Sequence, residues 1–223
     1  MKIEGCLLSI AVVFALFIGL IIFLLSGEKY SLKLEGYNSP INPDSLVVVG
    51  ENLIHNGDFE DHDSDMWRFA FQEKEGKILD RVGRNNSRGI MLVLKQDNGR
   101  DSFNQSIDLD DPPEVVVVTA WVKTEDLQCE VGAHVVVESS SQAQEHEVRY
   151  GSVGVVKSKK VSGNTPWTQL RFAALIHPDT DEIRVFGSVG GGRSRGKVFF
   201  DDIQAFPASR RSGPATNNNI QNP

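Results

Sequence analysis

The sequence predicts an all-β domain, either a sandwich or a barrel, preceded by a single transmembrane helix. Ten short runs rich in Val, Ile, Phe and Thr follow one another between residues 46 and 206, and Gly, Asn and Pro turn signals separate them. No apolar pattern with a helical period interrupts these runs, and short strands at regular spacing are typical of sandwiches and barrels. A separate apolar stretch of helical length lies near the N-terminus.

The N-terminal stretch CLLSIAVVFALFIGLIIFLL, residues 6–25, contains no charged residue. At about 1.5 Å per residue, a helix of this length reaches about 30 Å, the thickness of a bilayer's hydrocarbon core. Cleavable signal peptides usually have a shorter apolar region, followed by small residues at the cleavage site. The sequence SGEK that follows is a poor cleavage site. We therefore expect a retained membrane anchor, with a removed signal peptide as the alternative.

The rest of the chain divides by composition. Residues 26–45 are polar and contain two prolines, which predicts a linker. Residues 208–223 are rich in Asn, Ser and Pro without apolar periodicity, which predicts a disordered tail. The sandwich is therefore expected over residues 46–207, after a cytoplasmic stub and anchor over residues 1–25.

The expected strands follow the apolar runs in order. The run VVVV at 115–118 is apolar on both faces, so it is expected to form a central strand. The full set of runs is 46–49, 66–71, 89–95, 102–109, 114–123, 130–138, 147–156, 167–175, 181–189 and 197–206.

Two segments far apart in the sequence carry a family resemblance. NLIHNGDFE at 52–60 predicts a short entry strand, a tight Asn-Gly turn and an acidic strand start. KVFFDDIQAF at 197–206 predicts a closing strand that carries two carboxylates among large apolar residues. Between them MW at 66–67, VTAWVK at 118–123 and TPWT at 165–168 follow in family order, with Met66 where Gly is usual. Together they resemble the carbohydrate-binding modules found beside bacterial xylanases and glucanases. The resemblance implies their galactose-binding-like fold, a two-sheet jelly-roll sandwich.

The resemblance also implies that these two segments meet, and that a metal site lies where they do. In these modules, a Glu after the opening turn and an Asp in the last strand help to bind a structural calcium ion. The matching residues are Glu60 and Asp201, with Asp58 and Asp202 as weaker candidates. Calcium prefers hard oxygen ligands of this kind. A buried carboxylate needs some compensating partner, so the alternative is that Asp201 accepts backbone N–H bonds or pairs with an arginine.

A carbohydrate site would need exposed aromatic rings, on which the apolar face of a sugar can stack. Trp121 and Trp167 lie in runs that look central, so we expect both in the core. We expect Trp67 and Tyr150 to supply the exposed rings of a carbohydrate site on the concave sheet.

Other classes of function are disfavoured. A formal charge of −7 argues against a nucleic-acid partner, which would require a basic face. No catalytic serine, zinc-protease or phosphate-loop motif occurs, and the five histidines show no metal-ligand spacing. The chain is therefore expected not to be an enzyme.

The resulting hypothesis is a membrane-anchored, extracytoplasmic module that holds a glycan or envelope polysaccharide near the membrane. A periplasmic or extracellular domain is expected from the resemblance, because the charges that flank the anchor favour neither orientation. The alternative is a structural or protein-interaction module of the same fold, with an envelope protein as partner. An aromatic platform on the concave sheet would favour the first; small, charged or aliphatic residues there would favour the second.

Overall fold

The computed structural model describes residues 36–211, except 63, 71–76, 96–99 and 142–151. The chain divides into two compact units, Met1–Gly36 and Tyr37–Pro223, and the second contains nearly all of the described residues. The predicted anchor at 6–25 and most of the predicted tail lie outside the described residues. Among those described, no helix is both long enough and apolar enough to cross a bilayer.

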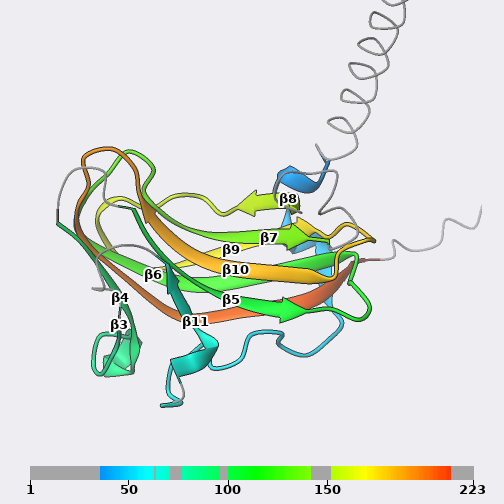
Figure 1. Cartoon of the computed structure of the whole chain (residues 1–223), viewed down its shortest axis with the longest axis horizontal. Helices are drawn as coiled ribbons and strands as arrows, with labels where there is room; N and C mark the ends of the chain where they lie inside the picture. Colours follow the sequence, from blue (N-terminus) through cyan, green and yellow to red (C-terminus); the bar gives the residue numbers. More distant parts are fainter. Residues whose placement is uncertain (1–35, 63, 71–76, 96–99, 142–151, 212–223) are drawn as a thin grey trace, which may run out of the picture. The chain divides into compact units, whose positions relative to one another are not determined.

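The described domain is a sandwich of two antiparallel β-sheets, which confirms the predicted all-β class (Figure 1). The six-stranded sheet has the order β3-β4-β11-β6-β9, with β1 also paired to β11, and the five-stranded sheet has the order β2-β5-β10-β7-β8. In chain order the strands are β1 (Leu46–Val48), β2 (Arg68–Ala70), β3 (Lys77–Leu79), β4 (Gly89–Leu94), β5 (Arg100–Asp108), β6 (Val115–Gln128), β7 (Ala133–Ser140), β8 (Ser152–Lys157), β9 (Gly163–Leu175), β10 (Glu182–Gly190) and β11 (Arg195–Arg210).

Most strands form where the sequence predicts them. Every described strand except β3 overlaps a predicted run, and β6 is central in its sheet as expected. Strand β11 extends to Arg210 and pairs there with β1, so it continues into the predicted tail. The compact unit begins at Tyr37, earlier than the predicted boundary at residue 46.

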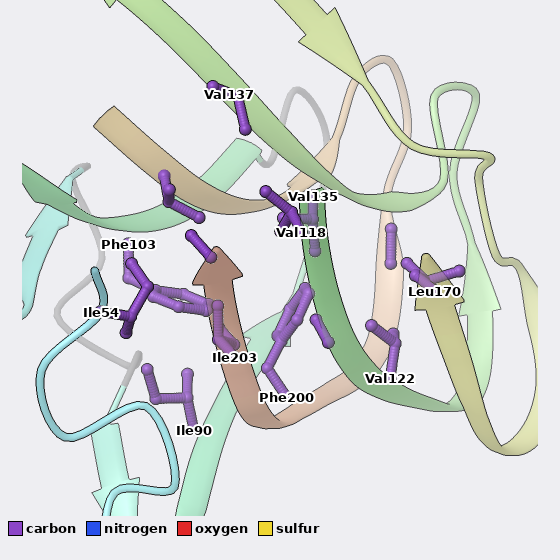
Figure 2. Packing of buried hydrophobic residues seen from close by; sticks show 14 of the residues in the cluster. Ile54, Ile90, Phe103, Val118, Val122, Val135, Val137, Leu170, Phe200 and Ile203 are labelled. Carbon is purple, nitrogen blue, oxygen red and sulfur yellow. The ribbon is translucent and has the colours of Figure 1, made fainter. Parts of the chain in front are cut away.

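The core forms because alternate residues of each strand face the opposite sheet. Along β6 the side chains of Val118, Ala120 and Val122 are buried, whereas the intervening residues are only half-buried. Residues from both sheets interdigitate around Phe103 and Phe200, whose rings meet edge to face at 5.0 Å (Figure 2). The outer faces carry most of the polar and charged side chains. The outer face of the six-stranded sheet also has a small apolar cluster, formed by Leu46, Val115, Val117, Ala173 and Ala208.

Strand β10 owes its position to a close approach within the core. The Phe103 ring of β5 lies against the backbone of Gly187, where an added Cβ would stand 2.2 Å from the ring. A larger residue at this position would have to displace the ring. Phe186 and Ser188 flank Gly187 and face the outside of the sheet, so the core contact fixes the strand that carries them.

The segment at 52–60 joins the two sheets instead of forming the predicted opening strand. On one side, Leu53 N–H donates to Ala205 O and Ile203 N–H donates to Gly57 O, both at 2.8 Å. On the other side, the buried Gln105 amide of β5 accepts from His55 N–H and donates to His55 O, at 2.8 and 2.9 Å. The predicted pairing of the opening and closing motifs is thus confirmed, although the opening motif is a turn and not a strand.

A second segment, at 37–45, covers one edge of each sheet. Asn38 Oδ1 accepts from the N–H of Val155 on β8, the edge strand of the five-stranded sheet. Ile41 forms a bridge with Ala173 on β9, the edge strand of the other sheet. The region predicted as linker therefore contributes to the folded domain from residue 37 onward.

Candidate functional site

A hollow of about 380 Å³ lies over the outer face of the five-stranded sheet. Such a volume falls within the range of about 300–1,000 Å³ that is common for ligand sites. Four strands, β5, β10, β7 and β8, supply most of its wall. Its lining residues are Arg100, Ser102, Val131, His134, Val136, Glu138, Lys157, Phe186, Ser188, Val189 and Gly190.

Phe186 provides the aromatic ring of the hollow. Strand pairing places it beside Asn104 of β5 on one side and Val136 of β7 on the other. Its side chain is half-buried, and the Arg184 guanidinium lies 5.9 Å from the ring centroid. A half-exposed ring within a polar wall presents an apolar surface that a ligand can reach.

Charged side chains stand on opposite sides of this ring. Arg100 of β5 and Lys157 of β8 are both exposed, and Glu138 of β7 lies between them in sheet order. Within the described part of the chain, none of these three side chains forms an ion pair or a hydrogen bond. They are therefore available to a ligand.

His134 completes the polar part of the wall. It is buried, and its Nδ1 lies 3.4 Å from Gly132 O. Burial lowers the pKa of His134 below 6.5, and the nearby positive charges of Lys157 and Arg100 lower it further, against the opposing effect of Gly132 O. The ring is therefore neutral at pH 7; Nδ1–H donates to Gly132 O, and Nε2 is left as an acceptor.

The prediction that Trp67 is exposed is wrong. Only 3% of Trp67 is accessible, and its ring packs 5.4 Å from both Phe59 and Phe103. Its indole Nε1–H donates to Asn56 O at 3.0 Å, so the opening turn holds this ring inside. Tyr150, the other ring predicted to bind sugar, lies outside the described residues.

The prediction that Trp121 and Trp167 lie in the core is also wrong. Both are half-buried. Trp121 shares the outer face of β6 with Thr119 and Lys123, because Val118, Ala120 and Val122 occupy the inner face. The Arg84 guanidinium covers the exposed face of Trp121 at 3.8 Å.

Phe186 is the functional candidate that the sequence analysis missed. A signal was present: Ile183 and Val185 alternate with Arg184 and Phe186, which places Phe186 on the polar face of its strand. An aromatic residue among polar residues on one face is a pattern typical of a binding surface.

The predicted calcium ligands are only partly brought together. Asp201 is 2% exposed and accepts bonds from Arg84 N–H at 2.6 Å, Ser87 O–H at 2.9 Å and Asp202 N–H at 2.8 Å. Burial raises the pKa of Asp201 above its ordinary value, while these three donors lower it in part and the neighbouring Asp202 raises it. Protein donors thus already compensate this buried carboxylate, as the alternative interpretation expected.

The other three carboxylates have separate partners. Glu60 accepts from Arg88 N–H at 2.8 Å, and Asp202 pairs with Arg84 at 2.6 Å. Asp58 and Asp202 both line a second, polar hollow of about 270 Å³ beside the opening turn. The described residues contain no group of three or more carboxylates, histidines or cysteines placed to share a metal. As they stand, these side chains do not fit a calcium site, and the calcium site stays a prediction.

Solved structures with a similar fold include several carbohydrate-binding modules. "Family 16 Carbohydrate Binding Module-2" is 16% identical with a TM-score of 0.50, and the match covers 69% of this chain and 99% of that one. TmCBM61 in complex with β-1,4-galactotriose is 20% identical with a TM-score of 0.47, over 70% and 99% of the two chains. The family 11 module from Clostridium thermocellum, with a β-1,3-1,4-mixed-linked tetrasaccharide, is 15% identical with a TM-score of 0.47, over 74% and 99%.

At these identities the likeness shows the fold alone, and it confirms the jelly-roll sandwich that the motifs implied. No protein-family model matches the sequence. No curated protein matches it significantly. Any assignment of function must therefore rest on the site itself.

Chelation tests the calcium prediction. If Glu60 and Asp201 share a calcium ion, removing it should lower Tm, because a ligand that binds only the folded state stabilises that state. Thermal unfolding with and without EDTA measures the effect, and Asp201→Ala should abolish it. An unchanged Tm of the wild type in EDTA would refute the site.

A buried acid beside the hollow predicts a dependence of stability on pH. Asp101 is 7% exposed, and burial raises its pKa from 3.8 to about 6, although the N–H of Ser102 lowers it in part. Between pH 4 and pH 6 the unfolded chain releases this proton while the folded chain retains it. The contribution of Asp101 to the free energy of unfolding is therefore most favourable below pH 4, and it is lost as the pH rises through 6.

Asp101→Asn should remove this loss. Between pH 4 and pH 7 this group should lower the free energy of unfolding of the wild type by on the order of 2–3 kcal/mol, and the variant should not show that decrease. Urea denaturation at the two pH values measures the difference. Asp108→Asn, an exposed position on the same strand, is the control and should track the wild type. Parallel pH profiles for Asp101→Asn and the wild type would contradict the assignment.

Proposed function

We propose that this chain is a non-catalytic carbohydrate-binding module that holds a glycan in the hollow on the five-stranded sheet. The observation that carries the proposal is the half-exposed ring of Phe186 in a wall that also carries polar and charged side chains. A pyranose has an apolar face of C–H groups and an edge of hydroxyl groups. It therefore requires both an aromatic surface and hydrogen-bonding partners in one place.

The wall supplies such partners around the ring. Ser102 and Ser188 carry hydroxyl groups, and Glu138 carries a carboxylate. The neutral His134, whose Nδ1 faces Gly132 O, adds an acceptor at Nε2. Because β-strands hold these groups, and not mobile loops, little order has to be gained when a ligand binds. The likeness in fold to modules described in complex with oligosaccharides also supports this proposal.

Phe186→Ala should abolish or strongly weaken glycan binding. Losing a buried aromatic contact should weaken the affinity about 10- to 100-fold. Calorimetry of the full-length protein with β-1,4-galactan, xylan and mixed-linked β-glucan measures this loss. Trp167→Ala is the matched control, because it removes a half-buried ring from the other sheet and should leave the affinity unchanged.

Two results would contradict the proposal. Loss of binding in Trp167→Ala but not in Phe186→Ala would move the site to the six-stranded sheet. Absence of binding to any glycan would favour the alternative, a protein-interaction module, since charged side chains such as Arg100, Lys157 and Glu138 also suit a protein partner.

We propose further that residues 6–25 anchor this module to a membrane, with the sandwich on the extracytoplasmic side. The support is the length and apolar character of that segment. The full-length protein should remain with membranes after washing with carbonate, and its intact mass should include the segment. A mature N-terminus near Glu28 would contradict the anchor.

A further inference from the structure

We infer that the glycan held in the hollow is an acidic polysaccharide, whose charged groups meet Arg100 on one side of Phe186 and Lys157 on the other. This inference rests on the proposed function, since it names the class of glycan that the same hollow would take. The charge is of the singly ionised kind, either a uronate carboxylate or a sulfate ester.

The first argument is the balance of charge in the hollow. The whole chain has a formal charge of −7. In the wall of the hollow, by contrast, Arg100 and Lys157 are opposed only by Glu138. The site thus has the sign opposite to that of the chain as a whole. Charge of one sign gathered in a hollow raises the local concentration of oppositely charged ligands.

The second argument is that these two cations have no partners within the described residues. Several arginines elsewhere in the described domain are paired: Arg84 with Asp202, Arg171 with Asp44 and Arg184 with Glu182. The contrast is strongest with Arg184, which lies on the same sheet face as the hollow and is paired at 2.8 Å. Unpaired cations can bind an external anion without first breaking an internal ion pair.

The third argument is spacing. Arg100 lies on β5 and Lys157 on β8, with β10 and β7 between them. Neighbouring strands are about 4.8 Å apart, so three steps account for about 14 Å across the sheet. The register adds about 13 Å along the strands, because Arg100 lies opposite Gly190 whereas Lys157 is level with Phe186, four residues away. The two backbones are therefore about 19 Å apart. A ligand with a single charge could not sit close to both positions unless both side chains folded inward. A polymer that repeats its charge along the chain can meet both while one of its sugars stacks on Phe186.

The presence of Glu138 limits the kind of anion. Its carboxylate lies in the same wall and repels a ligand that carries dense negative charge. A nucleic acid, with one phosphate for every few ångströms of chain, would need a longer basic stripe than these two cations. A glycan with one charge per sugar or fewer suits the observed balance.

Calorimetry on the full-length protein tests the inference with a matched pair of probes. Polygalacturonate and its methyl-esterified form share a backbone and differ in charge. The acidic form should bind at least about fivefold more tightly at low salt, the effect expected for one or two charge-assisted contacts. The preference should shrink at 0.5 M NaCl, because salt screens charges at the surface. A sulfated galactan and the neutral β-1,4-galactan distinguish sulfate from carboxylate and charge from backbone.

The variants locate the source of the preference. Arg100→Gln and Lys157→Gln should each reduce the ratio between acidic and neutral affinity, without abolishing the binding of neutral glycan. Lys197→Gln is the matched control, since this exposed lysine lies on β11 in the other sheet. Its ratio should equal that of the wild type.

Each outcome decides between the two proposals. Equal or tighter binding of the esterified or neutral glycan, or an unchanged ratio in both hollow variants, would overturn the inference and leave the proposed function standing. Binding of sulfated galactan alone would support an acidic ligand and identify its charge as sulfate. If no probe binds, acidic or neutral, the proposed function itself fails.

Discussion

The structure depends on how the gap between the two sheets is closed. At residues 52–60 the chain turns sharply, bonds to β11 on one sheet and receives the Gln105 amide from the other. Phe59 lies within this turn with a φ of 61° and is fully buried against Trp67. A left-handed backbone costs a residue like Phe about 1–2 kcal/mol, so aromatic packing must outweigh this cost.

The rings of Trp67 and Phe103 connect the turn at 52–60 to the candidate site. Trp67 packs on Phe103, and Phe103 occupies the space left by Gly187 on β10. The next residue along, Phe186, stands on the outer face of the same strand. The outer ring is therefore carried by a strand whose inner side is fixed by the core.

Most of the fold could be predicted from the sequence, because strand alternation is a local property. The exposures of Trp121 and Phe186 could have been predicted in the same way, from the polar residues two positions away on each strand. Trp121 was expected in the core instead because it lies in a run that looks central. Trp67 could not be placed, since its burial depends on a hydrogen bond to a turn eleven residues earlier.

The set of residues that lines the hollow could not be predicted from the sequence. Its wall combines β5, β10, β7 and β8, whose order in the sheet differs from their order in the chain. Arg100 and Lys157 are 57 positions apart in the sequence, and nothing local indicates that they flank one site. Non-local pairings of this kind are fixed by sheet order and register.

The segment at 37–45 shields two edge strands from pairing with another sheet. An uncovered edge strand presents free N–H and C=O groups to which another sheet can add, and such additions lead to aggregation. Here Asn38 occupies an N–H of β8 and Ile41 covers part of β9, so both terminal strands are partly capped by the same short piece of chain. A fragment cut at residue 46 would keep every strand and lose both caps. The cover of these two edges thus comes from outside the sheets, in a stretch whose composition predicts only a linker.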